Sequence, residues 1–186
     1  MLELIRTSLK EHLDCIQHMG ALTDILRQTG EQLIQTIQSG GCAFVCGNGG
    51  SAGDAQHFAA ELTGRFERER RGWPAVALTT DSSALTAIGN DYGFDFVFSR
   101  QMEALARPDD LLIAISTSGN SRNVLQAVAH AKANRIATIG LLGRDGGQLA
   151  REVDLALVVP SQRTARIQEM HILILHIWCE MLDAAG

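Results

Sequence analysis

Short uncharged apolar runs alternate along this chain with longer segments whose apolar residues recur at helical spacing. The runs hold β-branched side chains and no polar alternation, which is typical of strands buried on both faces of a parallel sheet. The predicted strands are residues 42–46, 74–78, 111–115, 136–142 and 155–159. The predicted helices are two over residues 2–39, one beginning at Ser51, and three over 94–106, 124–133 and 165–184. This alternation predicts an α/β protein with a doubly wound, flavodoxin-like parallel sheet.

The chain begins with two predicted helices that separate near residues 19–23 and end at Ser39. Their apolar stripes precede the first strand, so we expect them to pack on a partner subunit as well as on the body of their own chain. We therefore interpret residues 1–186 as one domain, in which residues 1–40 are a helical segment used in oligomer packing.

Composition and charge exclude some classes of partner. The formal net charge is −5, whereas a nucleic-acid surface requires a basic stripe. The basic run at residues 65–71 is interrupted by two glutamates, and we interpret it as the solvated end of a helix. We expect no nucleic-acid partner.

Cysteine spacing and hydropathy indicate the compartment. Cys15, Cys42, Cys46 and Cys179 show no CxxC or metal-ligand spacing, so we expect reduced thiols. Charged residues near the N-terminus argue against a signal peptide, and no uncharged apolar run reaches the roughly 20 residues that a membrane span needs. These features predict a cytoplasmic protein without a membrane partner.

Two loops that follow predicted strands have the character of anion sites. Residues 47–51 read GNGGS, in which Ser51 is a suitable N-cap for the next helix. Residues 116–121 read STSGNS, with four hydroxyls and a glycine before another helix. Backbone N–H groups and the helix dipole favour a phosphate at such positions without Lys or Arg. Neither loop matches a nucleotide-binding pattern.

The helix after the first loop carries an imidazole and a carboxylate on one face. His57 and Glu61 are spaced i, i+4, and Arg65 continues the row. Together with the anion loops, this pattern indicates acid–base chemistry on a phosphorylated small molecule. The alternative is an ordinary glycine turn followed by solvated polar residues, with Glu61 paired to Arg65.

Four stretches of the chain resemble those of a known protein family. The stretches GNGGSAGDAQHFAAELTGRF, AIGNDYGF, ISTSGNS and ARIQEMH are similar to those of the sugar isomerase (SIS) domain family, in particular of its members that act on phosphorylated heptoses. The resemblance implies a single SIS domain that converts sedoheptulose 7-phosphate to D-glycero-D-manno-heptose 7-phosphate for lipopolysaccharide synthesis. It also implies a homotetramer with active sites at subunit interfaces.

The resemblance also implies roles for individual residues. Glu61 matches the family's base and His176 its acid. The positions that match one zinc site per subunit are His57, Glu61, Gln168 and His176. The positions that match substrate contacts are Asn48, Gly49, Gly50, Ser51, Glu61, Arg65, Asn90, Asp91, Ser116, Thr117, Ser118, Ser121 and Gln168.

Two of the proposed zinc ligands are too far apart for one straight helix. Gln168 and His176 would lie roughly 12 Å apart along its axis. Either the last helix begins after Gln168, or one of the two ligands comes from a neighbouring subunit, which we favour. On the same helix, we expect His171 to be a core histidine rather than a ligand.

The chain departs from the family pattern at one position, and it also resembles a family member with a different function. Family members often carry Asp immediately before the Arg-Ile-Gln-Glu run, where this chain has Ala165, so any substrate contact from that carboxylate is absent. Parts of the chain also resemble a non-catalytic adaptor of the same family that binds a replication initiator protein. An adaptor has no need of a carboxylate at position 61 or an imidazole at position 176, so we favour the isomerase.

Overall fold

The computed structural model describes residues 1–186, the whole chain. Its centre is a five-stranded parallel sheet in the order β2-β1-β3-β4-β5. The strands are β1 (Ala43–Cys46), β2 (Ala75–Ala77), β3 (Leu111–Ser116), β4 (Ala137–Gly143) and β5 (Leu155–Val159). The predicted α/β class and the flavodoxin-like strand order are confirmed.

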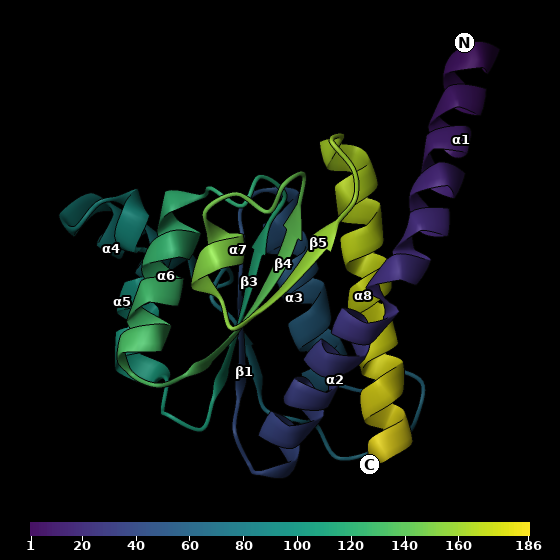
Figure 1. Cartoon of the computed structure of the whole chain (residues 1–186). Coiled ribbons are helices and arrows are strands. Elements are labelled where there is room, and N and C mark those ends of the chain that lie inside the picture. Colours follow the sequence, from purple (N-terminus) through teal and green to yellow (C-terminus); the bar gives the residue numbers. More distant parts are fainter.

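Helices cover both faces of the sheet (Figure 1). One face carries α2 (Thr23–Gln38), α3 (Gly50–Thr63) and α8 (Thr164–Ala185), and the other carries α4 (Ser82–Asp91), α5 (Ser99–Leu105), α6 (Arg122–Ala133) and the short α7 (Leu149–Glu152). The chain begins with α1 (Leu2–Met19). Two 3₁₀ turns span Gly20–Leu22 and Phe94–Phe96. No helix is long and apolar enough to cross a membrane.

Alternate side chains of each strand enter separate cores. Val45 and Ile113 pack in the core under α2, α3 and α8, while Phe44 and Leu112 pack on the other face. This explains why the strands read as continuous apolar runs, since both faces are buried. The first core is centred on Trp178 of α8, a fully buried side chain whose indole N–H donates to Thr29 Oγ1 over 3.2 Å.

Helix α1 extends beyond the body of the protein (Figure 1). The predicted pair of N-terminal helices is confirmed, with the junction at Gly20–Leu22. The exposed apolar side chains of α1 are Leu2, Leu4, Ile5, Leu9 and Leu13, each more than half exposed. Such a stripe on one helix is typical of a surface that a partner covers, and subunit packing stays a prediction.

Three local predictions were wrong. Helix α3 starts at Gly50, not after an N-cap at Ser51, because Gly49 adopts φ +56° and turns the chain into the helix. Ser51 is buried in the first turn and makes no capping bond. The predicted helix over 94–106 is broken into a 3₁₀ turn and α5. The basic run at 65–71 is an irregular segment and not a helix end.

Candidate functional site

The two predicted anion loops lie at the point where the chain connections change face. Strands β1 and β3 are neighbours, and the chain leaves β1 for α3 on one face and β3 for α6 on the other. Ligands of open α/β sheets bind at this point, outside the carboxyl ends of the strands. The side-chain amides of Asn48 and Asn123 join the loops, since each Nδ2 donates to the other's Oδ1 over 2.8 Å. The loops therefore form one site.

The loop after β3 presents hydroxyls beside a helix N-terminus. Ser116 Oγ lies 3.0 Å from Ser121 Oγ, and Ser121 immediately precedes α6. Gly119 adopts φ +67°, and any side chain there would overlap the backbone carbonyl of Gly146. Thr117 and Ser118 are half-buried between these points. The arrangement supplies hydroxyls and free N–H groups for a phosphate.

The predicted acid–base residues meet between α3 and α8. His57 Nε2 lies 3.0 Å from His176 Nε2 and 3.3 Å from Glu61 Oε1. The ring of Phe66 stacks on His176 with a centroid distance of 5.5 Å. Glu61 does not pair with Arg65, which lies 3.5 Å from Glu69 at the surface. The structure therefore brings together an imidazole pair and a carboxylate.

Gln168 lies near the start of α8, next to the start of α3. Helix α8 is continuous from Thr164 to Ala185, so the alternative in which it begins after Gln168 is wrong. The amide of Gln168 occupies the space where a side chain at Gly50 would be. Within one chain Gln168 thus contacts the start of α3, roughly 12 Å along the α8 axis from His176. A ligand from a neighbouring subunit stays a prediction.

His57, Glu61 and His176 have the chemistry of zinc ligands. Two ligands of a tetrahedral zinc, each bonded at about 2.0–2.2 Å, stand about 3.3–3.6 Å apart. The nitrogen–nitrogen and nitrogen–oxygen distances here, 3.0 and 3.3 Å, are close to that spacing. No group of three or more His, Cys, Asp or Glu side chains in the chain is arranged to hold a metal ion as it stands. A zinc ion would require a small rotation of these side chains and a further ligand.

Two predicted substrate contacts lie apart from the others. Asn90 and Asp91 belong to the last turn of α4, and the Asn90 amide donates to the Asp91 carboxylate over 2.7 Å. Helix α4 lies on the opposite side of the sheet from α3 and α8 (Figure 1). Both residues are exposed.

Asn123, Phe66 and Asp54 were missed by the sequence analysis. Asn123 stands at the start of the helix after STSGNS, where a polar residue is a weak signal, and Phe66 looked like an ordinary apolar residue. Asp54 lies one turn before His57, and its Oδ2 is buried without a partner. Burial raises the pKa of the Asp54 carboxyl to about 6, an effect that nearby His57 opposes.

His171 is a core histidine, as expected. Its side chain is fully buried, and Nε2 lies 3.0 Å from the carbonyl oxygen of Leu142. Because burial disfavours the imidazolium, the pKa of His171 falls to about 4, an effect that the Leu142 hydrogen bond opposes. His171 is therefore neutral at physiological pH and takes no part in the site.

Comparison with known proteins finds relatives that match nearly the whole chain. The SIS domain model matches residues 9–143. A phosphoheptose isomerase of Helicobacter hepaticus is 52% identical over 184 residues, covering 99% of this chain and 94% of that protein. The solved structure of a phosphoheptose isomerase from Neisseria gonorrhoeae superposes with a TM-score of 0.94 at 49% identity, covering 98% of both chains. One from Francisella tularensis gives 0.95 at 40% identity, again covering 98% of both chains.

The neutral state of His171 predicts a pH dependence of stability. The folded-state pKa of about 4 lies below the ordinary 6.5, so the unfolded chain binds a proton first as the pH falls. Relative to His171→Gln, which keeps a donor for the Leu142 carbonyl, the wild type should lose about 2 kcal/mol of unfolding free energy between pH 7.5 and pH 5. Urea unfolding at each pH measures this difference. Parallel pH profiles would contradict the assignment.

Proposed function

This chain belongs to the SIS domain family, among its phosphoheptose isomerases, and we propose that it isomerises sedoheptulose 7-phosphate with Glu61 and His176 as the acid–base pair. The observation that carries the proposal is the contact of His57 with both Glu61 and His176, close to two loops suited to phosphate. A non-catalytic adaptor has no need of this contact. The isomerase is therefore better supported than the adaptor that binds a replication initiator.

The reaction needs one base and one acid. Glu61 takes a proton from C1 of the ketose while His176 gives one to the oxygen at C2, which produces an enediol. Removal of the proton from the C1 oxygen and return of a proton to C2 then yields the aldose, D-glycero-D-manno-heptose 7-phosphate. No atoms are gained or lost overall. His57 lies between the two groups and orients them through the 3.0 and 3.3 Å contacts.

The rest of the substrate extends toward the two loops. The 7-phosphate binds the hydroxyls of the STSGNS loop and the N-terminus of α6. These hydroxyls belong to Ser116, Thr117, Ser118 and Ser121. The sugar lies over residues 48–51, with Gln168 beside Gly50. Arg65 and the α4 residues Asn90 and Asp91 contact substrate in this proposal only across a subunit boundary.

We propose a homotetramer whose active sites lie at subunit interfaces. The exposed apolar stripe of α1 supplies a surface for such packing, and a neighbouring copy would bring its own Gln168 toward His57 and His176. A Gln168 from a neighbouring copy can reach the site of His176, although Gln168 and His176 of one chain are far apart along α8. The four free thiols fit a cytoplasmic enzyme, and its product would enter heptose supply for lipopolysaccharide.

We also propose one zinc ion per subunit. His57, Glu61 and His176 would hold it with Gln168 of a neighbouring copy. When bound, zinc would polarise the substrate oxygens as a Lewis acid. The chain's own contribution is unchanged, since Glu61 remains the group that removes the carbon proton.

Replacing the base tests the mechanism. Glu61→Gln should keep the fold but lower kcat by roughly 10²–10⁴-fold, the usual share of one acid–base group. Glu180→Gln is the matched control, because Glu180 is an exposed carboxylate one turn beyond His176 on α8. The assay follows conversion of sedoheptulose 7-phosphate. Wild-type turnover in Glu61→Gln would remove Glu61 from the mechanism.

Removing a hydroxyl tests the phosphate loop. Ser116→Ala should raise KM for sedoheptulose 7-phosphate by about 10-fold or more, since a hydrogen bond to a charged group contributes about 1.5–3 kcal/mol. The kcat should change little, because the phosphate does not react. Ser99→Ala is the control, since the Ser99 hydroxyl bonds the carbonyl of Phe96, outside the loop. An unchanged KM would move the phosphate elsewhere.

Metal removal tests the zinc proposal separately. Dialysis against a chelator should lower the activity and added zinc should restore it, because a Lewis acid assists the transfer at oxygen. Elemental analysis of the untreated protein should find one zinc per chain. Full activity in metal-free protein would leave the acid–base pair acting alone.

A further inference from the structure

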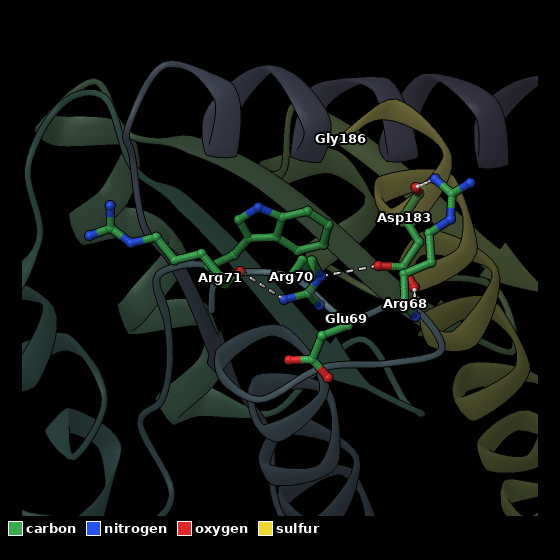
Figure 2. Close-up of a pocket in the computed structure, with 7 residues that line it drawn as sticks. Arg68, Glu69, Arg70, Arg71, Asp183 and Gly186 are labelled. Carbon is green, nitrogen blue, oxygen red and sulfur yellow. Dashed lines mark hydrogen bonds and ion pairs between the residues drawn. The ribbon is translucent and has the colours of Figure 1, made fainter.

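The segment of residues 64–72 lies between α3 and β2 in the chain and packs against the last turns of α8. Helix α3 ends at Thr63, and the segment then passes the last turns of α8 before the chain enters β2 (Figure 1). Figure 2 shows Arg70 of this segment joined to Asp183 of α8, beside a cavity of about 530 Å³. The basic run that the sequence analysis placed in solvent therefore contains a largely buried arginine, whose side chain is 13% exposed.

Arg70 binds backbone carbonyl groups in the last turn of α3. Nη2 donates to the backbone carbonyl of Glu61 over 2.9 Å, and Nη1 donates to that of Leu62 over 3.0 Å. The last carbonyls of a helix lack partners within it, and a guanidinium supplies several donors in a fixed plane. The plane itself lies 3.5 Å from the ring centre of Trp73. One of the two carbonyls belongs to the proposed catalytic base.

Asp183 binds the same segment from α8. Its Oδ1 accepts from Arg70 Nε over 3.0 Å, and its Oδ2 accepts from the backbone N–H groups of Glu67 and Arg68 over 3.2 and 3.1 Å. The Asp183 side chain is only 6% exposed. Both carboxylate oxygens are thus committed to residues 67–70, and the end of α8 is fixed to the end of α3.

These bonds bear on the geometry of the site. Asp183 lies seven residues, about two turns, beyond His176 on α8. Phe66, from the same segment, stacks on the His176 ring. The segment therefore contacts the backbone of one member of the acid–base pair and the side chain of the other. A misplacement of about 1 Å at a reacting group can lower a rate by 10²-fold.

We propose that Arg70 and Asp183 are positioning residues, which hold Glu61 of α3 and His176 of α8 at the separation that proton transfer requires. The inference rests on the proposed function, because it assigns these residues an effect on that acid–base pair. Replacing a whole buried ion pair by apolar residues is often neutral for stability, whereas removing one partner is destabilising, so the test measures turnover and stability separately.

The test compares turnover with substrate affinity. Arg70→Met keeps an unbranched stem but loses every donor, and it should lower kcat roughly 10- to 100-fold. The KM for sedoheptulose 7-phosphate should change less than about threefold, since the phosphate loop belongs to β3 and α6. Arg70→Lys, which supplies fewer donors, should fall between wild type and Arg70→Met. If Arg70→Met folds poorly, Asp183→Asn is the second variant to assay. It should also lower kcat with little change in KM.

A matched control separates alignment from general loss of stability. Asp110 is also a buried carboxylate that accepts from two backbone N–H groups, those of Cys42 and Arg107. It lies at the start of β3, at the opposite end of the sheet from the loops. Asp110→Asn should lower the midpoint of thermal unfolding but leave kcat unchanged at temperatures where it is folded.

Combining variants identifies the route of the effect. In a Glu61→Gln background, Arg70→Met should cause no further loss of kcat, because its effect acts through the alignment of Glu61 with His176, and that pair no longer works once Glu61 is replaced. Wild-type kcat in folded Arg70→Met and Asp183→Asn, with Glu61→Gln still impaired, would overturn the positioning role alone. A fully additive loss in the double variant would also overturn it. Failure of the wild type to isomerise sedoheptulose 7-phosphate would instead reject the proposed function.

Discussion

The packing of α3 against α8 decides which side chains meet in this protein. The two helices lie on the same face of the sheet, and Phe58 contacts Trp178 edge-on with a centroid distance of 6.0 Å. His57 immediately precedes Phe58, His176 lies two residues before Trp178, and the two imidazoles come within 3.0 Å of each other across the helix pair. The helices are more than 100 residues apart in the sequence, so the site exists only because the core holds them together.

The same register accounts for both ends of the site. At the start of the pair, Gln168 covers Gly50 next to the anion loops, and at the far end Asp183 holds the segment that follows α3. The acid–base residues lie between these two fixed points. In the proposed mechanism, substrate binding and proton transfer thus depend on one helix pair, which is fixed at both ends.

Much of this could be predicted from the sequence, for clear physical reasons. Strand runs buried on both faces are local patterns that predict the sheet class correctly, and the loops GNGGS and STSGNS after them predict an anion site. The i, i+4 spacing of His57 and Glu61 is equally local. The contact of His57 with His176 is not local, and the role of His176 was inferred only from the family resemblance.

Other features depended on tertiary contacts that no local pattern carries. Arg70 belongs to a run of charges that looks like solvated surface, and only the position of Asp183 and Trp73 shows that it is buried. The reciprocal Asn48–Asn123 pair needs two loops brought together by the strand order. The position of Asn90 and Asp91 at the end of α4, away from α3 and α8, also depends on the packing of distant elements.

The central claim is that Glu61 moves a proton between carbon atoms of the sugar. Isomerisation of sedoheptulose 7-phosphate in deuterium oxide, followed by NMR, tests it most directly. The wild type should introduce solvent deuterium at C2 of the aldose and at C1 of the recovered ketose, and Glu61→Gln should introduce it at least 10²-fold more slowly. Deuterium uptake at the wild-type rate in Glu61→Gln would contradict the account.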